Sequence, residues 1–360
     1  MFSKVSVRSF ATSIPRAVKV STTPSTAPSA VSTLKVIIKN AGSKSGPAGL
    51  PHLAAASSFL DTVSKTGLRL KRESELLGGE YKSSITRDNI VLEANFLKEN
   101  LPYFVNVLGN VLTETQYKPH ELKEIALPYA SAVSYGASST PSFAALEELH
   151  AISFRKGLGN PLYFDGSKSY TSEDVAAFAK SAITSESVEI IGENVVEADL
   201  SNFVKQSAFS SLPEGTTSIK AEQKTYTGVE SRVRKAGVTS AVIGVPVSPA
   251  QTSAYSLLAA YVSANLQDPH TASVETKVAK YDSASLFYVS VSSSNAAEVS
   301  ALITDAAKLI KSGADLSAYK SLASYQSGVS VSSAPSTVSV SALNLAVVGD
   351  IDAVPHVDEL

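Results

Sequence analysis

The sequence predicts an α+β protein built from two similar domains, each with a mixed β-sheet and helices packed against it. At 360 residues the chain is long enough for two domains of ordinary size, each with a core of its own. A series of strand-like and helix-like segments in the first half recurs in the same order, with little residue identity, in the second half. Hairpin-like strands and paired helices favour this α+β class over parallel βαβ winding.

The N-terminal segment has the composition of a targeting sequence. The chain contains no Asp or Glu before Asp61, and its opening is rich in Arg and Ser without the apolar stretch of a secretory signal. We therefore expect a mitochondrial transit peptide over residues 1–17, cleaved after Phe10 or after Ala17. A basic tail without a targeting role is the alternative. Residues 18–30, rich in Ser, Thr and Pro, are expected to form a linker.

The first domain is expected over residues 31–212, where strand-like alternation and helix-end signals follow one another. Asn100 can cap a helix, and Thr171 with Asp174 forms a capping-box pattern before another. The expected elements, in chain order, are a strand at 32–39, a helix around His52, a helix ending at the glycines 78–79, a hairpin at 80–87 and 89–97, a helix from 101 to about 112, a helix at 172–181, a strand at 187–192 and a helix at about 196–209.

The second domain is expected over residues 225–360, after a linker at 213–224 that opens with Pro213 and Gly215. Its pattern follows the order of the first domain. The expected elements are a strand at 232–247, a helix at 250–266, strands at 273–281 and 284–292, helices at 296–312 and 316–326, and a last strand at 341–349.

Residues 236–267 carry no charge, and this run of 32 residues is long enough on paper to span a bilayer. Glycines and prolines interrupt it, so we expect a strand, a turn and a helix, and no membrane span. An uncharged stretch of this length also suits a contact with another subunit. We expect Tyr261 to lie on an outer helix face near such a contact.

Composition and missing motifs exclude several functional classes. The absence of cysteine excludes disulfides, thiolate catalysis and cysteine-ligated metal centres. A net charge of −2 without a basic stripe argues against nucleic acid as a partner. The chain contains no G-x-x-x-x-G-K-[ST] phosphate loop and no G-x-S-x-G. The acidic pair Glu147 and Glu148 is expected on a solvated helix face, and no cofactor is expected.

The five residues from His52 to Ala56 match a zinc-peptidase motif from which the reactive groups are missing. In inverted zincins a helix carries H-x-x-E-H, where the two histidines hold zinc and the glutamate is the general base. Here the first histidine is His52, while Ala55 replaces the base and Ala56 replaces the second histidine. A single imidazole cannot hold zinc at trace concentrations, so no metal and no catalytic residue are expected. His52→Ala is therefore expected to be nearly silent.

The element order and three strings, at 72–79, 150–161 and 192–200, resemble the pitrilysin-type M16 metallopeptidases and their processing-peptidase relatives from about residue 32 to the end of the chain. The resemblance implies two M16-like domains that form the halves of a bowl. It also implies a third zinc ligand, a glutamate, near Ser131, Ala132 and Val133. No acidic residue occurs from 125 to 146, so this ligand is missing as well.

Within the family, the strings are most similar to the non-peptidase core subunits of mitochondrial ubiquinol–cytochrome c reductase, complex III. This implies a structural role in assembly and stability of the complex, without peptidase activity or a redox centre. The implied partners are a homologous core protein 1 subunit, cytochrome b, cytochrome c1 and small subunits of a dimeric complex, at the matrix side of the inner membrane. The alternative is the non-catalytic, presequence-binding subunit of the mitochondrial processing peptidase.

Overall fold

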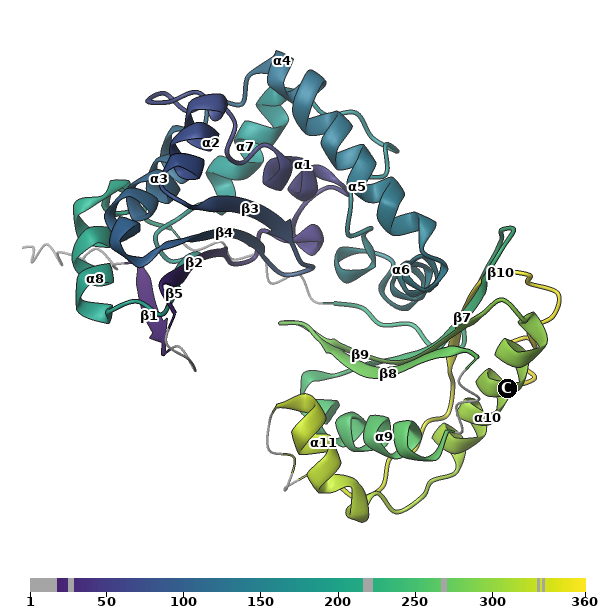
Figure 1. Cartoon of the computed structure of the whole chain (residues 1–360). Helices are drawn as coiled ribbons and strands as arrows, with labels where there is room; N and C mark the ends of the chain where they lie inside the picture. Colours follow the sequence, from purple (N-terminus) through teal and green to yellow (C-terminus); the bar gives the residue numbers. More distant parts are fainter. Residues whose placement is uncertain (1–17, 25–28, 216–222, 267–270, 329–330, 332–333) are drawn as a thin grey trace, which may run out of the picture.

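The computed structural model describes residues 18–24, 29–215, 223–266, 271–328, 331 and 334–360 (Figure 1). The expected transit peptide at 1–17 lies outside these residues. Within them, no helix is both long enough and apolar enough to cross a membrane.

Each half of the chain contains a five-stranded mixed sheet, and the two sheets have equivalent strand orders. The first has the order β1-β5-β2-β4-β3 and the second β6-β10-β7-β9-β8. The pair of strands at one end of each sheet, β1 with β5 and β6 with β10, is parallel. All other pairs are antiparallel. The strands are β1 Lys19–Thr23, β2 Val31–Ile38, β3 Glu80–Ile85, β4 Ile90–Leu97, β5 Val188–Glu193, β6 Glu230–Arg234, β7 Thr239–Val247, β8 Ser273–Lys280, β9 Ser285–Ser293 and β10 Asn344–Gly349.

Helices pack against the sheet of each half, and in the second half α9, α10 and α11 lie on the face of the sheet that points away from the first half (Figure 1). In the first half they are α1 Leu50–Ala56, α2 Gly67–Leu76, α3 Leu101–Glu114, α4 Pro119–Glu121, α5 Leu127–Ser139, α6 Pro141–Phe154, α7 Ser172–Ala182 and α8 Glu197–Gln206. A π-helical turn, Leu122–Ala126, joins α4 to α5. In the second half they are α9 Thr252–Asn265, α10 Ala296–Lys311 and α11 Lys320–Ser327. These bounds confirm the expected α+β class and the internal repeat.

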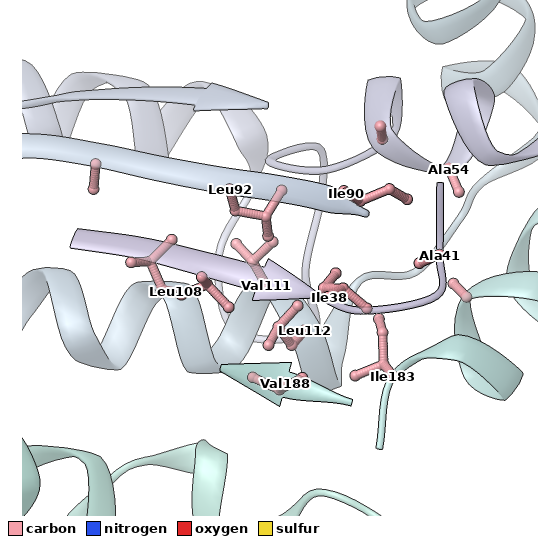
Figure 2. Packing of buried hydrophobic residues seen from close by; sticks show 14 of the residues in the cluster. Ile38, Ala41, Ala54, Ile90, Leu92, Leu108, Val111, Leu112, Ile183 and Val188 are labelled. Carbon is pink, nitrogen blue, oxygen red and sulfur yellow. The ribbon is translucent and has the colours of Figure 1, made fainter. Parts of the chain in front are cut away.

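The core of the first half forms where one face of its sheet meets the helices. Along β2 buried and half-buried residues alternate, as expected for a sheet with one covered face. The apolar face predicted for the helix after Asn100 is buried in α3, and Leu108, Val111 and Leu112 pack among residues of β2, β4 and β5 (Figure 2). The capping box of Thr171 and Asp174 at α7 is also confirmed.

Helix α6 belongs to the first half by sequence but packs on the sheet of the second half (Figure 1). Ala145 and Leu149 of α6 lie in one apolar cluster with Val242 of β7 and Leu286 of β9. A Cβ on Gly244 would lie 2.9 Å from a methyl of Leu149, so a glycine there allows the close approach. Both faces of the second sheet are therefore buried, which explains why β7 and β9 are almost uninterrupted runs of buried residues.

Several elements differ from the expectation. Residues 19–23, in the expected linker, form the edge strand β1, since β5 supplies parallel backbone partners that no local pattern reveals. The expected strand at 232–247 is two strands, β6 and β7, because Gly237 at φ 110° lies in the turn between them. Asn100 makes no capping bond; its amide donates to Leu77 O at 2.9 Å.

The uncharged run at 236–267 forms β7 and α9, as predicted, and both are buried within the chain. Tyr261 is half-buried, and its ring packs against Tyr319 with 5.3 Å between ring centroids. Packing inside the domain therefore accounts for most of the missing charges, and a subunit contact near Tyr261 stays a prediction.

Candidate functional site

The helix with the degenerate motif, α1, begins after a tight turn at Gly49. Gly49 has φ 83°, a left-handed conformation that favours glycine, and a Cβ there would lie 2.8 Å from the Phe164 ring. Pro51 lies in the first turn, where its missing N–H costs nothing. The chain thus enters α1 close to the 163–164 segment, and this places His52 against that segment.

His52 is buried and takes part in a structural contact. Its side chain is 4% exposed, and its Nδ1 accepts a hydrogen bond from the backbone N–H of Phe164 at 3.0 Å. Because Nδ1 is the acceptor, the neutral ring carries its proton on Nε2. The ring packs against Tyr163 with 4.9 Å between centroids. Burial lowers the pKa of His52 to about 4, so the ring is neutral at physiological pH.

The other two motif positions present only methyl groups. Ala55 is buried, and its carbonyl oxygen accepts a hydrogen bond from Ser83 Oγ of β3 at 2.7 Å. Ala56 is half-buried against the same core. Neither side chain has a lone pair for a metal or a proton, so neither residue can be a zinc ligand or a general base.

The region expected to supply a third ligand lies on α5, which contacts α1. Ser131 and Ala132 are exposed there, Val133 is half-buried, and none of the three is a carboxylate. Across the described residues, no group of three or more His, Asp or Glu side chains is placed to hold a metal ion. The structure therefore brings α1 and α5 together, but within the described residues it assembles no ligand set on them.

A second group of buried polar residues, which the sequence did not single out, joins the two halves. His150 of α6 donates from Nδ1 to Leu146 O at 2.7 Å and accepts at Nε2 from the Tyr281 hydroxyl at 2.7 Å. This assignment follows because a carbonyl oxygen can only accept. Complete burial holds the pKa of His150 well below its ordinary value. Tyr281 lies in the turn after β8, so this contact links the first half to the second.

Charged side chains surround this contact. Arg87 is buried, donates to Leu158 O at 2.9 Å and Asn160 O at 2.8 Å, and forms an ion pair with Glu147. Glu148 accepts from Ser231 Oγ of β6 at 2.7 Å. The expectation of a solvated face for Glu147 and Glu148 was wrong, because α6 is sandwiched between the two halves.

Lys44 lies between Asp88 of the first half and Asp282 of the second. It forms an ion pair with Asp88, and its Nζ is 3.2 Å from Asp282 Oδ2. The backbone N–H of Asp282 also donates to Asp88 Oδ2 at 3.3 Å. The junction is thus held by complementary charges.

Comparison with known proteins identifies the family that the first half matches and a structure that shares the fold. Residues 20–166 match the family described as Insulinase (Peptidase family M16). A structure titled peptidase M16 inactive domain from Pseudomonas fluorescens superposes with a TM-score of 0.74 at 13% identity, over 94% of this chain and 98% of that chain, and so shares the fold.

The chain is also similar over its length to mitochondrial proteins named cytochrome b-c1 complex subunit 2. The Debaryomyces hansenii protein is 40% identical over 100% of both chains. The Saccharomyces cerevisiae protein is 39% identical over 93% of this chain and 94% of its own, and the Yarrowia lipolytica protein is 33% identical over 89% and 80%. The chain therefore belongs to the M16 family, among the mitochondrial cytochrome b-c1 complex subunit 2 proteins.

Proposed function

We propose that the chain is the structural core subunit 2 of ubiquinol–cytochrome c reductase and supports assembly and stability of that complex. The observation that carries the proposal is the similarity over the whole chain to proteins that bear this name, at 40% and 39% identity. The buried contacts of α6 with the second sheet agree with it, since they pack the two halves of the chain against each other.

The chain contributes no peptidase chemistry and no zinc site in this proposal. Three of the four groups that such a site needs are methyl groups or uncharged residues, at Ala55, Ala56 and on α5. The fourth group, His52, uses Nδ1 to hold the Phe164 backbone. Elemental analysis of the purified chain should find less than 0.1 zinc per chain at roughly micromolar zinc; a stoichiometric content that EDTA removes would refute this part.

The proposed partners are a homologous core protein 1 subunit, cytochrome b, cytochrome c1 and small subunits, in a dimeric complex with this chain on the matrix side. The names of the relatives support a mitochondrial b-c1 complex. The two halves would form one wall of a bowl that the core protein 1 subunit closes. No redox cofactor is assigned to this chain.

Depletion and rescue separate a structural role from a catalytic one. Loss of the chain should reduce the b and c1 haem signals of assembled complex III, and wild-type chain should restore them. The motif is best probed at His52. His52→Asn removes the imidazole but keeps an acceptor for the backbone N–H of Phe164, whereas leucine at positions 55 and 56 would distort α1. His52→Asn should restore assembly fully; failure of a stable His52→Asn protein to restore it would show that the imidazole has a functional role.

A further inference from the structure

An acid pair, Asp61 and Glu121, lies where the loop that follows α1 meets the segment that follows α3. Asp61 belongs to the loop 57–66 between α1 and α2, and Glu121 is the last residue of α4. The backbone N–H of Asp61 donates to Glu121 Oε1 at 3.2 Å, and the carbonyl oxygen of Asp61 accepts from the Gln116 N–H at 3.0 Å. Glu121 is only 5% exposed. The acid pair therefore forms part of a buried contact that joins the loop 57–66 to residues 116–121.

Both carboxylate oxygens of Asp61 have hydrogen-bond partners. Its Oδ1 accepts from the Gly67 N–H at 2.8 Å, and its Oδ2 accepts from Lys118 Nζ at 2.6 Å. The hydrogen bond from Lys118 holds the pKa of Asp61 below its ordinary value. Asp61 is therefore ionised at neutral pH, and Lys118 balances its charge.

The carboxyl group of Glu121 lacks such partners. Its Oε2 is buried and has no hydrogen-bond partner within the part of the chain that the structure describes. An ionised carboxylate can accept about four hydrogen bonds, and burying its charge with few donors is costly. A neutral acid fits this environment better, because Oε1 still accepts the bond from the Asp61 N–H while Oε2 carries the proton.

The charges beside Glu121 also favour its neutral form. Burial raises the pKa of Glu121 above its ordinary value. The hydrogen bond from the Asp61 N–H opposes this shift, and the negative charge of the Asp61 carboxylate adds to it. Lys118, the cation that contacts the pair, is already bound to Asp61. If Glu121 were ionised, two buried carboxylates would share one ammonium group.

Other titratable side chains around the acid pair do not supply a second cation. Lys65 of the same loop forms an ion pair with Glu73, at 2.5 Å between Nζ and Oε2. Burial raises the pKa of the Tyr117 phenol to about 12, so this group stays neutral. Glu114, at the end of α3, adds a further acid, and its carbonyl oxygen accepts from the loop at 3.0 Å. The remaining side chains on α4 and the turn after it are exposed, namely His120, Lys123 and Glu124.

We infer that the acid pair holds one proton, carried by Glu121, and that this proton keeps the loop 57–66 closed against residues 116–121. When Glu121 ionises, a second negative charge is buried beside Asp61, and the contact weakens. The loop connects α1 to α2, and the π-helical turn after Glu121 leads into α5. The acid pair is thus a proton-dependent contact between the segments that connect these helices. The inference does not depend on the proposed function.

The direction of the pH dependence follows from linkage. The pKa of Glu121 in the folded chain lies above the ordinary 4.5. Its contribution to stability is therefore fully present below pH 4.5 and is lost as pH rises through the folded-state value. The loop should loosen as pH rises, whereas the contribution of His52 is lost as pH falls.

Amide hydrogen exchange of the purified full chain tests the inference. Protection of a peptide that covers 57–66 is measured at pH 5 and at pH 8.5 and corrected for the intrinsic exchange rate. In wild type it should fall at least about threefold at the higher pH, which corresponds to a pKa shift of roughly half a unit. Glu121→Gln cannot ionise and should keep its protection. Glu124→Gln, at an exposed acid in the next turn, is the matched control and should behave like wild type.

Three results would overturn the inference. Equal protection of wild type at both pH values would show that no proton controls the loop. A parallel fall in wild type and Glu121→Gln would assign the pH dependence to another group. Weaker protection of Glu121→Gln than of wild type at pH 8.5, or failure of this variant to fold in urea refolding, would show that the ionised carboxylate holds the loop.

Lys118→Gln separates a proton-dependent contact from a purely structural one. Without the ammonium group the acid pair should hold its proton more tightly, because a nearby opposite charge lowers the pKa of an acid. The pH at which half of the protection is lost should therefore rise by at least about half a unit. A uniform loss of protection at all pH values, with an unmoved midpoint, would contradict the inference.

Discussion

Replacement of His52 by alanine tests whether this histidine stabilises the fold or is only a remnant of the zinc motif. The side chain is 4% exposed and accepts a hydrogen bond from the Phe164 backbone N–H at 3.0 Å. Without the ring this buried N–H loses its partner, at a cost of about 1–3 kcal/mol. The lost packing against Tyr163 adds roughly 1 kcal/mol or more. We expect His52→Ala to lower the free energy of unfolding by about 2–4 kcal/mol.

The assay is urea denaturation of the purified chain at pH 7.5. His52→Asn should recover about half of the loss, since an amide oxygen can take the place of Nδ1 as acceptor. His120→Ala, at an exposed histidine, is the matched control and should change stability by less than about 0.5 kcal/mol. If His52→Ala proves as mild as this control, the contact with Phe164 does not stabilise the fold, and the prediction of silence from the sequence stands.

Three further predictions concern pH, packing and processing. Because the folded-state pKa of His52, about 4, lies below the ordinary 6.5, its contribution is present above pH 6.5 and is lost as pH falls toward 4. Wild type should then lose up to roughly 3 kcal/mol more stability than His52→Asn over this window; parallel pH profiles would contradict this. Tyr261→Asp should destabilise the isolated chain by about 1–3 kcal/mol, because the ring packs inside the domain. The urea midpoint of unfolding measures this loss. An unchanged midpoint would favour the subunit contact that the sequence predicts for Tyr261. N-terminal sequencing of the mitochondrial protein should begin after Phe10 or Ala17, and retention of Met1 would refute the transit peptide.

Local pattern predicted the elements whose signals lie close together in the chain. The strand at 32–39, the hairpin after Gly79 and the capping box at Thr171 follow from alternation and helix-end chemistry, and each was found. The edge strand β1 was missed because its partner β5 lies far along the chain, at 188–193. A short Ser/Thr-rich segment looks like a linker until a neighbouring strand supplies its hydrogen bonds.

The environment of the motif could be predicted only in part. Substitution of the ligands is visible in the sequence itself, at Ala55 and Ala56. The role of His52 depends on the backbone of Phe164, which is 112 residues away, and no periodicity connects the two. The crossing of α6 was hidden for the same reason, since its apolar face resembles that of any core helix until Leu149 meets the second sheet.

Native electrophoresis of solubilised inner membranes, probed for this chain and stained for haem, shows directly whether the chain is part of complex III. We expect nearly all of the chain to comigrate with b and c1 haem. A chain found mainly in a smaller, haem-free assembly that binds or cleaves presequence peptides would contradict it and favour the processing-peptidase alternative.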